Sequence, residues 1–266
     1  IAIEATERTL SQCAATETEL AVLQAAFAEE AAGEPFRTGM RGERAGQFEN
    51  LRHLAEGNVP VTRAIVPQKK ADDSWAAWDR VVDLWARPMV DRSNAWMLRY
   101  HTRVLKATEI PGGDRYAAIR ELGDEPKSLT GYDMIIARLM TPAVDKIADA
   151  ERRIKTTAYC AIAGLAAERF RLKKGRWPAN LNELVQLKLL DRLPDDLFSG
   201  QSLRFRRSPD GIVIHSVGAD GAYQGDARDR PEELDPRNAP FEFRLWDPAK
   251  RRQAPLPKKP DVDEDR

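Results

Sequence analysis

Residues 170–221 read FRLKKGRWPANLNELVQLKLLDRLPDDLFSGQSLRFRRSPDGIVIHSVGADG, and they indicate a clear order of secondary structure. Trp177-Pro178 ends a long helix, because proline lacks an amide hydrogen and clashes with the preceding turn. A short helix follows, from Asn180 or Leu181 through Leu189, and Pro194 begins an Asp-rich irregular stretch. The chain therefore changes from helical to extended structure within this segment.

Two strands come next. Residues 202–207 alternate apolar and basic side chains, and residues 212–217 are rich in β-branched side chains, which favour strands. The intervening Ser208-Pro-Asp-Gly211 is typical of a hairpin turn, with Gly211 supplying a positive φ. Residues 241–246 alternate again and predict a further strand. We expect an antiparallel sheet of three or four strands that buries one face against the helix over residues 154–172.

The first 140 residues are predicted to be entirely helical. Glycine and proline separate the apolar patterns along this part of the chain. The predicted helices cover residues 4–32, 41–55, about 74–110 and 114–122, with Gly123 closing the last of these. A further helix runs from Ser128 or Thr130 to about Lys174, and Pro142 should kink it or divide it in two at Thr141.

The predicted fold class is therefore α+β, with a helical amino-terminal region, a long helix and a small antiparallel sheet packed on it. The expected organisation is a helical region over residues 1–140, an α+β module over 141–247, and a tail over 248–266. The tail combines Pro255, Pro257 and Pro260 with charged residues, which is typical of an extended or disordered end.

The charges of the chain balance overall. The 42 Lys and Arg residues equal the 42 Asp and Glu residues, so the whole chain offers no electrostatic reason to bind nucleic acid or an anionic membrane, although local patches remain open. The longest uncharged run, residues 156–167, is well short of the roughly 20 apolar residues of a membrane span. The chain begins at Ile1 without an initiator methionine, and we expect an upstream signal or anchor.

Four phrases in this part of the chain carry a resemblance to a known family. They are Phe170-Arg-Leu-Lys-Lys-Gly175-Arg-Trp177-Pro178, then Leu181-Asn-Glu-Leu184-Val185, then Asp196-Leu-Phe198-Ser-Gly200, and lastly Ser216-Val-Gly218-Ala-Asp220-Gly221. In this order they resemble the carboxy-terminal module of type II secretion major pseudopilins and related pilin-like proteins, over roughly residues 145–247. The long helix is not amino-terminal here, and about 140 helical residues precede it.

This resemblance implies a non-enzymatic structural or interaction protein of bacteria, extracytoplasmic and membrane-anchored in its full-length form. It also implies protein partners or self-assembly. In the major pseudopilins the loop after Ser-x-Gly-x-Asp-Gly binds calcium, a cation that takes six to eight oxygen ligands. On this chain Asp220 matches directly and Asp226 matches by position, with Asp229 nearby. The alternative is a solvated Asp-Gly loop whose carboxylates pair with Arg228 or Arg230.

Two alternative functions remain open from the residues. One is an enzyme or ligand-binding protein with a cleft between the helical region and the sheet, where clefts commonly occur. The other is a cytoplasmic adaptor that uses its helices and Pro-rich tail. The sequence shows no nucleophile elbow, no phosphate-binding loop and no His or Cys pair at metal-ligand spacing, so we assign no catalytic residue.

Several other side chains are predicted to have structural roles. Cys13 and Cys160 are expected to be two buried thiols rather than a disulfide, and His215 a partly buried ring with one hydrogen bond. Two groups complete the set: Trp75, Trp78, Trp85 and Trp96 as one buried helix face, and Arg204, Arg206 and Arg207 as a solvated sheet face.

Overall fold

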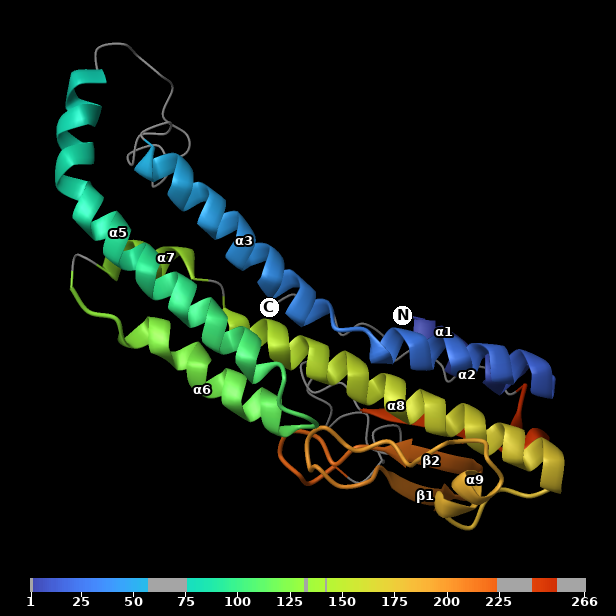
Figure 1. Ribbon diagram of the computed structural model, residues 1–266. Coiled ribbons are helices and arrows are strands. Elements are labelled where there is room, and N and C mark those ends of the chain that lie inside the picture. Colours follow the sequence, from blue (N-terminus) through green and yellow to red (C-terminus); the bar gives the residue numbers. More distant parts are fainter. Residues whose placement is uncertain (1, 57–75, 132–133, 142, 224–240, 253–266) are drawn as a thin grey trace, which may run out of the picture. The chain divides into compact units, whose positions relative to one another are not determined.

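The computed structural model describes residues 2–56, 76–131, 134–141, 143–223 and 241–252. The chain forms two compact units (Figure 1). Unit 1 combines Ile1–Ala31 with Thr156–Arg266, and unit 2 is Ala32–Lys155. These units do not coincide with the expected division at residue 140, because both chain ends contribute to the unit that holds the sheet.

Unit 1 begins with two helices, α1 (Ala2–Gln12) and α2 (Glu17–Ala32), and not with the single helix expected over residues 4–32. A capping box starts α2. The Thr16 hydroxyl accepts a hydrogen bond from the Glu19 amide at 3.3 Å, and the Glu19 carboxylate accepts one from the Thr16 amide at 2.8 Å. This reciprocal arrangement satisfies amides that a helix start leaves without partners, so it stabilises a new helix at this point.

The sheet has three strands in the order β1 (Arg204–Ser208), β2 (Gly211–His215) and β3 (Glu242–Trp246), all antiparallel. The predicted hairpin turn at residues 208–211 is present, since Ser208 pairs with Gly211 in the register. A side chain at Gly211 would place its Cβ 1.9 Å from the Leu245 carbonyl oxygen, so glycine is required by the approach of β3. The predicted α+β class is confirmed.

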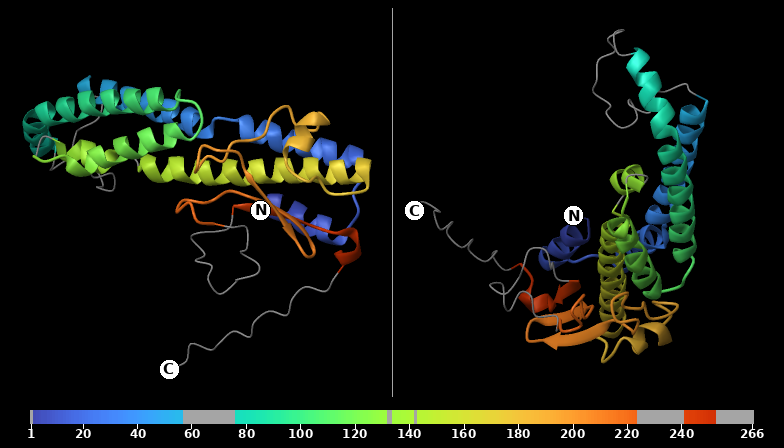
Figure 2. Two further views of the ribbon diagram at one scale, coloured as in Figure 1. Left: turned by 90° about the horizontal axis from the view of Figure 1, so that it is seen from below. Right: turned by 90° about the vertical axis from the view of Figure 1, so that its left-hand side faces the viewer.

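The sheet packs on the second half of α8 (Val144–Lys174), as predicted, and both Figure 1 and Figure 2 show the strands alongside this helix. Alternate residues Ile212, Ile214, Phe243 and Leu245 join the alanine-rich stretch of α8 in one apolar core. A Cβ on Gly164 would lie 2.2 Å from Phe243 Cδ1. The missing side chain at Gly164 therefore lets β3 approach the helix closely.

The rest of unit 1 packs around this core. The short helix α9 (Asn182–Gln186) contributes the buried Leu184. The 3-10 helix η5 (Pro248–Lys250) follows β3 directly. Arg251 donates a 2.7 Å hydrogen bond to the fully buried Glu168 of α8. The expectation of an extended or disordered end beginning at residue 248 is therefore wrong as far as residue 252, because a buried ion pair holds this part; residues 253–266 lie outside the described residues.

Unit 2 is helical. It contains α3 (Pro35–Ala55), α5 (Ala76–Ala107), α6 (Asp114–Ser128), α7 (Ile135–Met140) and the first part of α8. The division between α7 and α8 next to Pro142 agrees with the prediction. Gly123 does not end its helix, because α6 continues to Ser128; a Cβ at Gly123 would lie 2.6 Å from the Asp145 Cβ, so this glycine allows close packing.

Candidate functional site

The buried carboxylate of Asp196 connects two of the four phrases on which the pseudopilin resemblance rests. Its Oδ1 accepts hydrogen bonds from the Ser216 hydroxyl at 2.7 Å and from the Phe198 amide at 2.9 Å. Its Oδ2 accepts from the Val217 amide at 3.0 Å and from the Ser199 hydroxyl at 3.1 Å. Asp196 therefore holds the turn at residues 196–200 against the end of β2.

These four donors occupy both oxygens of the Asp196 carboxylate. A buried carboxylate with four donors has its hydrogen-bonding capacity satisfied by the protein, and losing any one of these donors would cost a buried hydrogen bond. These hydrogen bonds suit Asp196 to positioning the loop after β2. The sequence contained a signal for it, because Asp at the start of a turn commonly accepts from the amide two residues later.

The predicted calcium residues lie in the loop that Asp196 positions. Asp220 is exposed, and its Oδ1 accepts a 3.2 Å hydrogen bond from the Ala222 amide, while Gly218 and Gly221 turn the backbone with φ of 75° and 71°. Asp226 and Asp229 lie outside the described residues. In the part of the chain that the structure describes, no three His, Cys, Asp or Glu side chains cluster as a metal site requires. The described residues alone do not make a calcium site.

His215 is placed beside this loop. Its ring is buried, and its Nδ1 lies 3.1 Å from the Ser216 carbonyl oxygen, which can only accept, so Nδ1 carries the proton. Burial lowers the pKa of His215, despite the hydrogen bond to Ser216. Tyr223 packs edge-on against the ring and donates a 2.6 Å hydrogen bond to Glu242, the residue paired with His215 across the sheet. The predicted buried ring with one hydrogen bond matches this environment.

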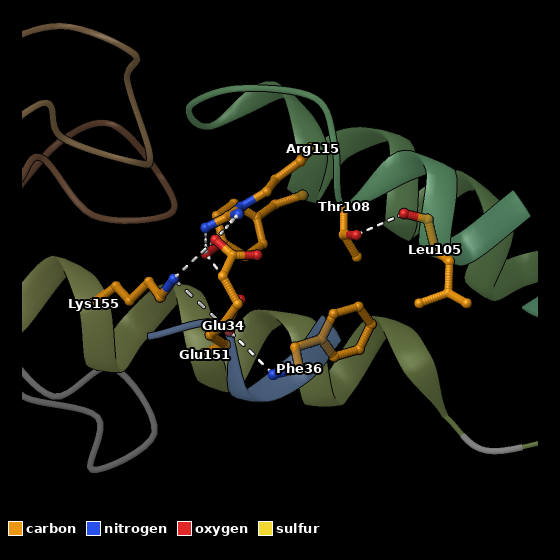
Figure 3. A network of polar contacts seen from close by, with 8 residues as sticks. Glu34, Phe36, Leu105, Thr108, Arg115, Glu151 and Lys155 are labelled. Carbon is orange, nitrogen blue, oxygen red and sulfur yellow. Dashed lines mark hydrogen bonds and ion pairs between the residues drawn. The ribbon is translucent and has the colours of Figure 1, made fainter. Parts of the chain in front are cut away.

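A second polar centre, which the sequence analysis missed, lies in unit 2 and is shown in Figure 3. We call Glu34, Arg115, Tyr116, Glu151 and Lys155 the charge network. Arg115 donates to Glu34 at 3.0 Å and to the Tyr116 hydroxyl at 3.2 Å, and Tyr116 donates to Glu151 at 3.3 Å. Lys155 lies 3.6 Å from Glu34 and 3.9 Å from Glu151. Glu151 and Lys155 are one turn apart on α8.

The charge network contains two carboxylates and two cations, so its charges balance. Burial opposes ionisation of Glu34, but the hydrogen bond and charge of Arg115, with the charge of Lys155, outweigh it and lower the Glu34 pKa. Burial raises the pKa of Tyr116 to about 12, so this hydroxyl remains a donor. Glu151 also accepts from the Phe36 amide at 3.2 Å, near the start of α3. The network thus joins the segment before α3 to α6 and α8.

An open apolar groove of about 660 Å³ lies between α1 and α2 in unit 1. Leu10, Cys13, Ala15, Val22 and Leu23 are among its lining residues, and Val22 is 64% exposed. The lining of the groove is mainly apolar, with Thr6, Thr9, Thr18 and Glu19 as its polar residues. It is better suited to another apolar surface than to catalysis.

Two structural assignments from the sequence are wrong in part. Cys13 is exposed rather than buried, whereas Cys160 is buried and burial raises its pKa; both thiols are free. Trp85 is exposed, although it was expected in a buried helix face, while Trp96 is half-buried and stacks on Tyr100 at 4.9 Å between ring centroids. Trp75 lies outside the described residues.

The arginines of β1 face solvent to differing degrees. Arg204 is exposed and donates to the Gln201 side chain at 3.1 Å, and the exposed Arg207 lies 3.9 Å from Asp247. Arg206 is half-buried. Asp247 also accepts a hydrogen bond from the indole of Trp177, so the Trp177-Pro178 phrase is tied to the end of β3. These partners agree with a sheet face that is satisfied by local contacts.

No protein-family model matches the chain, and no curated protein or solved structure shows significant similarity to it. Among the helices that the structure describes, none has the length and apolar character needed to cross a bilayer.

Proposed function

We propose that the chain is a non-enzymatic structural protein with a pseudopilin-like module over residues 141–247, and that it functions by assembling with copies of itself on the extracytoplasmic side of a bacterial membrane. The observation that carries this proposal is the Asp196 carboxylate, which joins the turn at 196–200 to the Ser216-Val-Gly218 strand end. Two of the resembling phrases thus meet at one buried group, beside a sheet that packs on a long helix.

The distribution of polar groups supports a structural role. Two buried polar centres, Asp196 and the charge network, are occupied by internal hydrogen bonds and ion pairs. Both hold loops and helix starts in place. We propose the apolar groove between α1 and α2, which precede the module in the chain, as the assembly surface of the protein, because Val22 exposes an apolar side chain at it. We also propose that a segment outside this sequence anchors the protein in the membrane.

Calcium binding by Asp220 and Asp226 is part of the same proposal. Asp220 stands in a glycine-turned loop that Asp196 holds in place, and further carboxylates follow it in the sequence. Calcium would supply charge neutralisation and order in this loop.

Sedimentation velocity over a wide concentration range tests self-assembly. We expect the wild-type chain to associate as concentration rises, and Val22→Asp to remain monomeric, because a charge in the groove would be desolvated on assembly. Leu172→Asp, at an apolar side chain of α8 that is also exposed, is the matched control and should associate like the wild type. A wild-type chain that stays monomeric throughout would reject self-assembly.

A further inference from the structure

The solvent face of α5 carries a continuous stripe that changes from apolar to basic along the helix. Positions three or four residues apart share a face of an α-helix. On α5 such positions form what we call the α5 stripe: Val81, Trp85, Pro88, Arg92, Ala95, Arg99, Thr102 and Lys106. All of these are exposed except Thr102, which is half-buried.

The amino-terminal end of the α5 stripe is apolar. Trp85 is 81% exposed, Leu84 beside it is 74% exposed, and Val81 is 45% exposed. The opposite face of these turns already packs in a core, because Ala86 and Val90 are buried in the apolar cluster of unit 2. Side chains of Trp and Leu rarely stand so exposed beside one another unless another apolar phase covers them.

The carboxy-terminal end of the α5 stripe is basic. Within the described part of the chain, neither Arg99 nor Lys106 makes an ion pair, and both are exposed. Arg103, beside them, pairs with Glu125 of α6. The acidic residue nearest to the stripe on α5 itself is Asp91. Arg99 and Lys106, neither with an ion pair among the described residues, therefore continue the line that begins with Trp85.

We propose that the α5 stripe binds an anionic phospholipid surface, with Trp85 and Leu84 entering the acyl boundary and Arg99 and Lys106 contacting headgroup phosphates. Trp with neighbouring aliphatic side chains suits the interface between headgroups and acyl chains, and long cationic side chains reach the phosphates. A helix lying flat on the surface presents both ends of the stripe at once. This inference is independent of the proposed module, since α5 belongs to unit 2.

Vesicle co-sedimentation tests the proposal with the intact chain. Probes are vesicles of phosphatidylcholine alone, vesicles of phosphatidylcholine with phosphatidylserine, and soluble polyglutamate as an acidic polypeptide. We expect binding to the phosphatidylserine vesicles that weakens with salt, because each Lys or Arg near such a surface contributes about fivefold in affinity. The double variant Arg99→Glu with Lys106→Glu should then bind at least about 25-fold more weakly.

The variant Leu84→Ser with Trp85→Ser should lose on the order of tenfold in vesicle binding, while its response to salt remains. The matched control Arg41→Glu with Lys146→Glu changes the charge equally at exposed positions of unit 2 outside the stripe. It should bind like the wild type, and circular dichroism should show the same helix content for every variant. No binding to phosphatidylserine vesicles, equal losses in the control, or binding to polyglutamate alone would each overturn the proposal.

Discussion

Replacing Gly164 by alanine should destabilise unit 1, although alanine is the better helix former. The added Cβ would lie 2.2 Å from Phe243 Cδ1, whereas an ordinary contact begins near 3.4 Å. The ring must therefore move by more than 1 Å, and it is completely buried against α8. Overpacking of this kind costs about 3 kcal/mol at the upper end of its usual range. The higher helix propensity of alanine offsets about 1 kcal/mol of this cost, so we expect a net loss of about 2 kcal/mol in the free energy of unfolding.

Thermal and urea unfolding followed by circular dichroism measure this effect. A loss of about 2 kcal/mol should lower the midpoint temperature by roughly 4–8 °C for a unit of this size. Gly46→Ala is the matched control: Gly46 lies in α3 and is exposed, and a Cβ there meets no atom within 4 Å. That substitution should stabilise the protein by about 0.5–1 kcal/mol.

The two substitutions are chemically identical, so their opposite signs depend only on packing. Combining Gly164→Ala with Phe243→Leu should recover part of the loss, because the smaller side chain leaves room for the methyl group. A Gly164→Ala protein as stable as the wild type would refute the close approach of β3 to α8.

Asp196→Asn should lower the free energy of unfolding in urea by about 3–4 kcal/mol, because the new amide NH₂ would face two donors. Asp220→Asn, in the exposed loop, is the control and should change stability by less than about 0.5 kcal/mol. Equal effects of the two substitutions would contradict the role of Asp196 in holding the loop. Burial lowers the pKa of His101 and of His215, so the unfolded chain binds more protons below about pH 6.5 and stability should fall between about pH 7 and pH 5. His101→Phe should reduce this pH dependence in urea unfolding, and an unchanged slope would exclude His101 as its source. Calcium should raise the unfolding midpoint relative to chelator in the wild type and not in Asp220→Ala with Asp226→Ala, whereas the same midpoint in all samples would remove the metal from the proposed function.

The sheet was predictable because its signals are local. The alternation in β1, the β-branched run of β2 and the turn before Gly211 each act within a few residues. The position of β3 followed from the same alternation, and its pairing with β2 was the simplest way to complete the sheet. Pro142 is likewise a local signal for a helix break, because proline lacks an amide hydrogen and clashes with the preceding turn.

The missed features depend on residues far apart in the sequence. The charge network brings Glu34 to Arg115 and Lys155, and no local pattern specifies that meeting. From the local sequence alone, Gly123 predicts the end of a helix. Its close contact with Asp145 shows instead that glycine at this position allows tight packing. The break before α2 had a local signal, the Thr16 and Glu19 capping box, which the strong helix formers around it obscured.

The candidate site was only partly accessible from sequence. Asp196 and Asp220 could be selected as turn residues from their motifs. Their different environments, one fully buried with four donors and one exposed, could not be known without the contact between the turn and β2. The exposure of Trp85 could not be predicted from the sequence either, because residue spacing shows which side chains share a helix face but not which face packs on the core.

The composition of unit 1 from both chain ends has a consequence for biosynthesis. The Glu7 carboxylate of α1 accepts a 3.3 Å hydrogen bond from the Arg244 amide, and the Ser11 carbonyl accepts one from the Arg252 amide at 2.9 Å. During synthesis, α1 and α2 leave the ribosome before β3 has been made. Their apolar faces therefore stay exposed while all of unit 2 is synthesised. Unit 2 can fold before β3 is synthesised, whereas unit 1 is complete only after β3 has been synthesised. We therefore expect the nascent chain to need protection by a chaperone chiefly at residues 1–31.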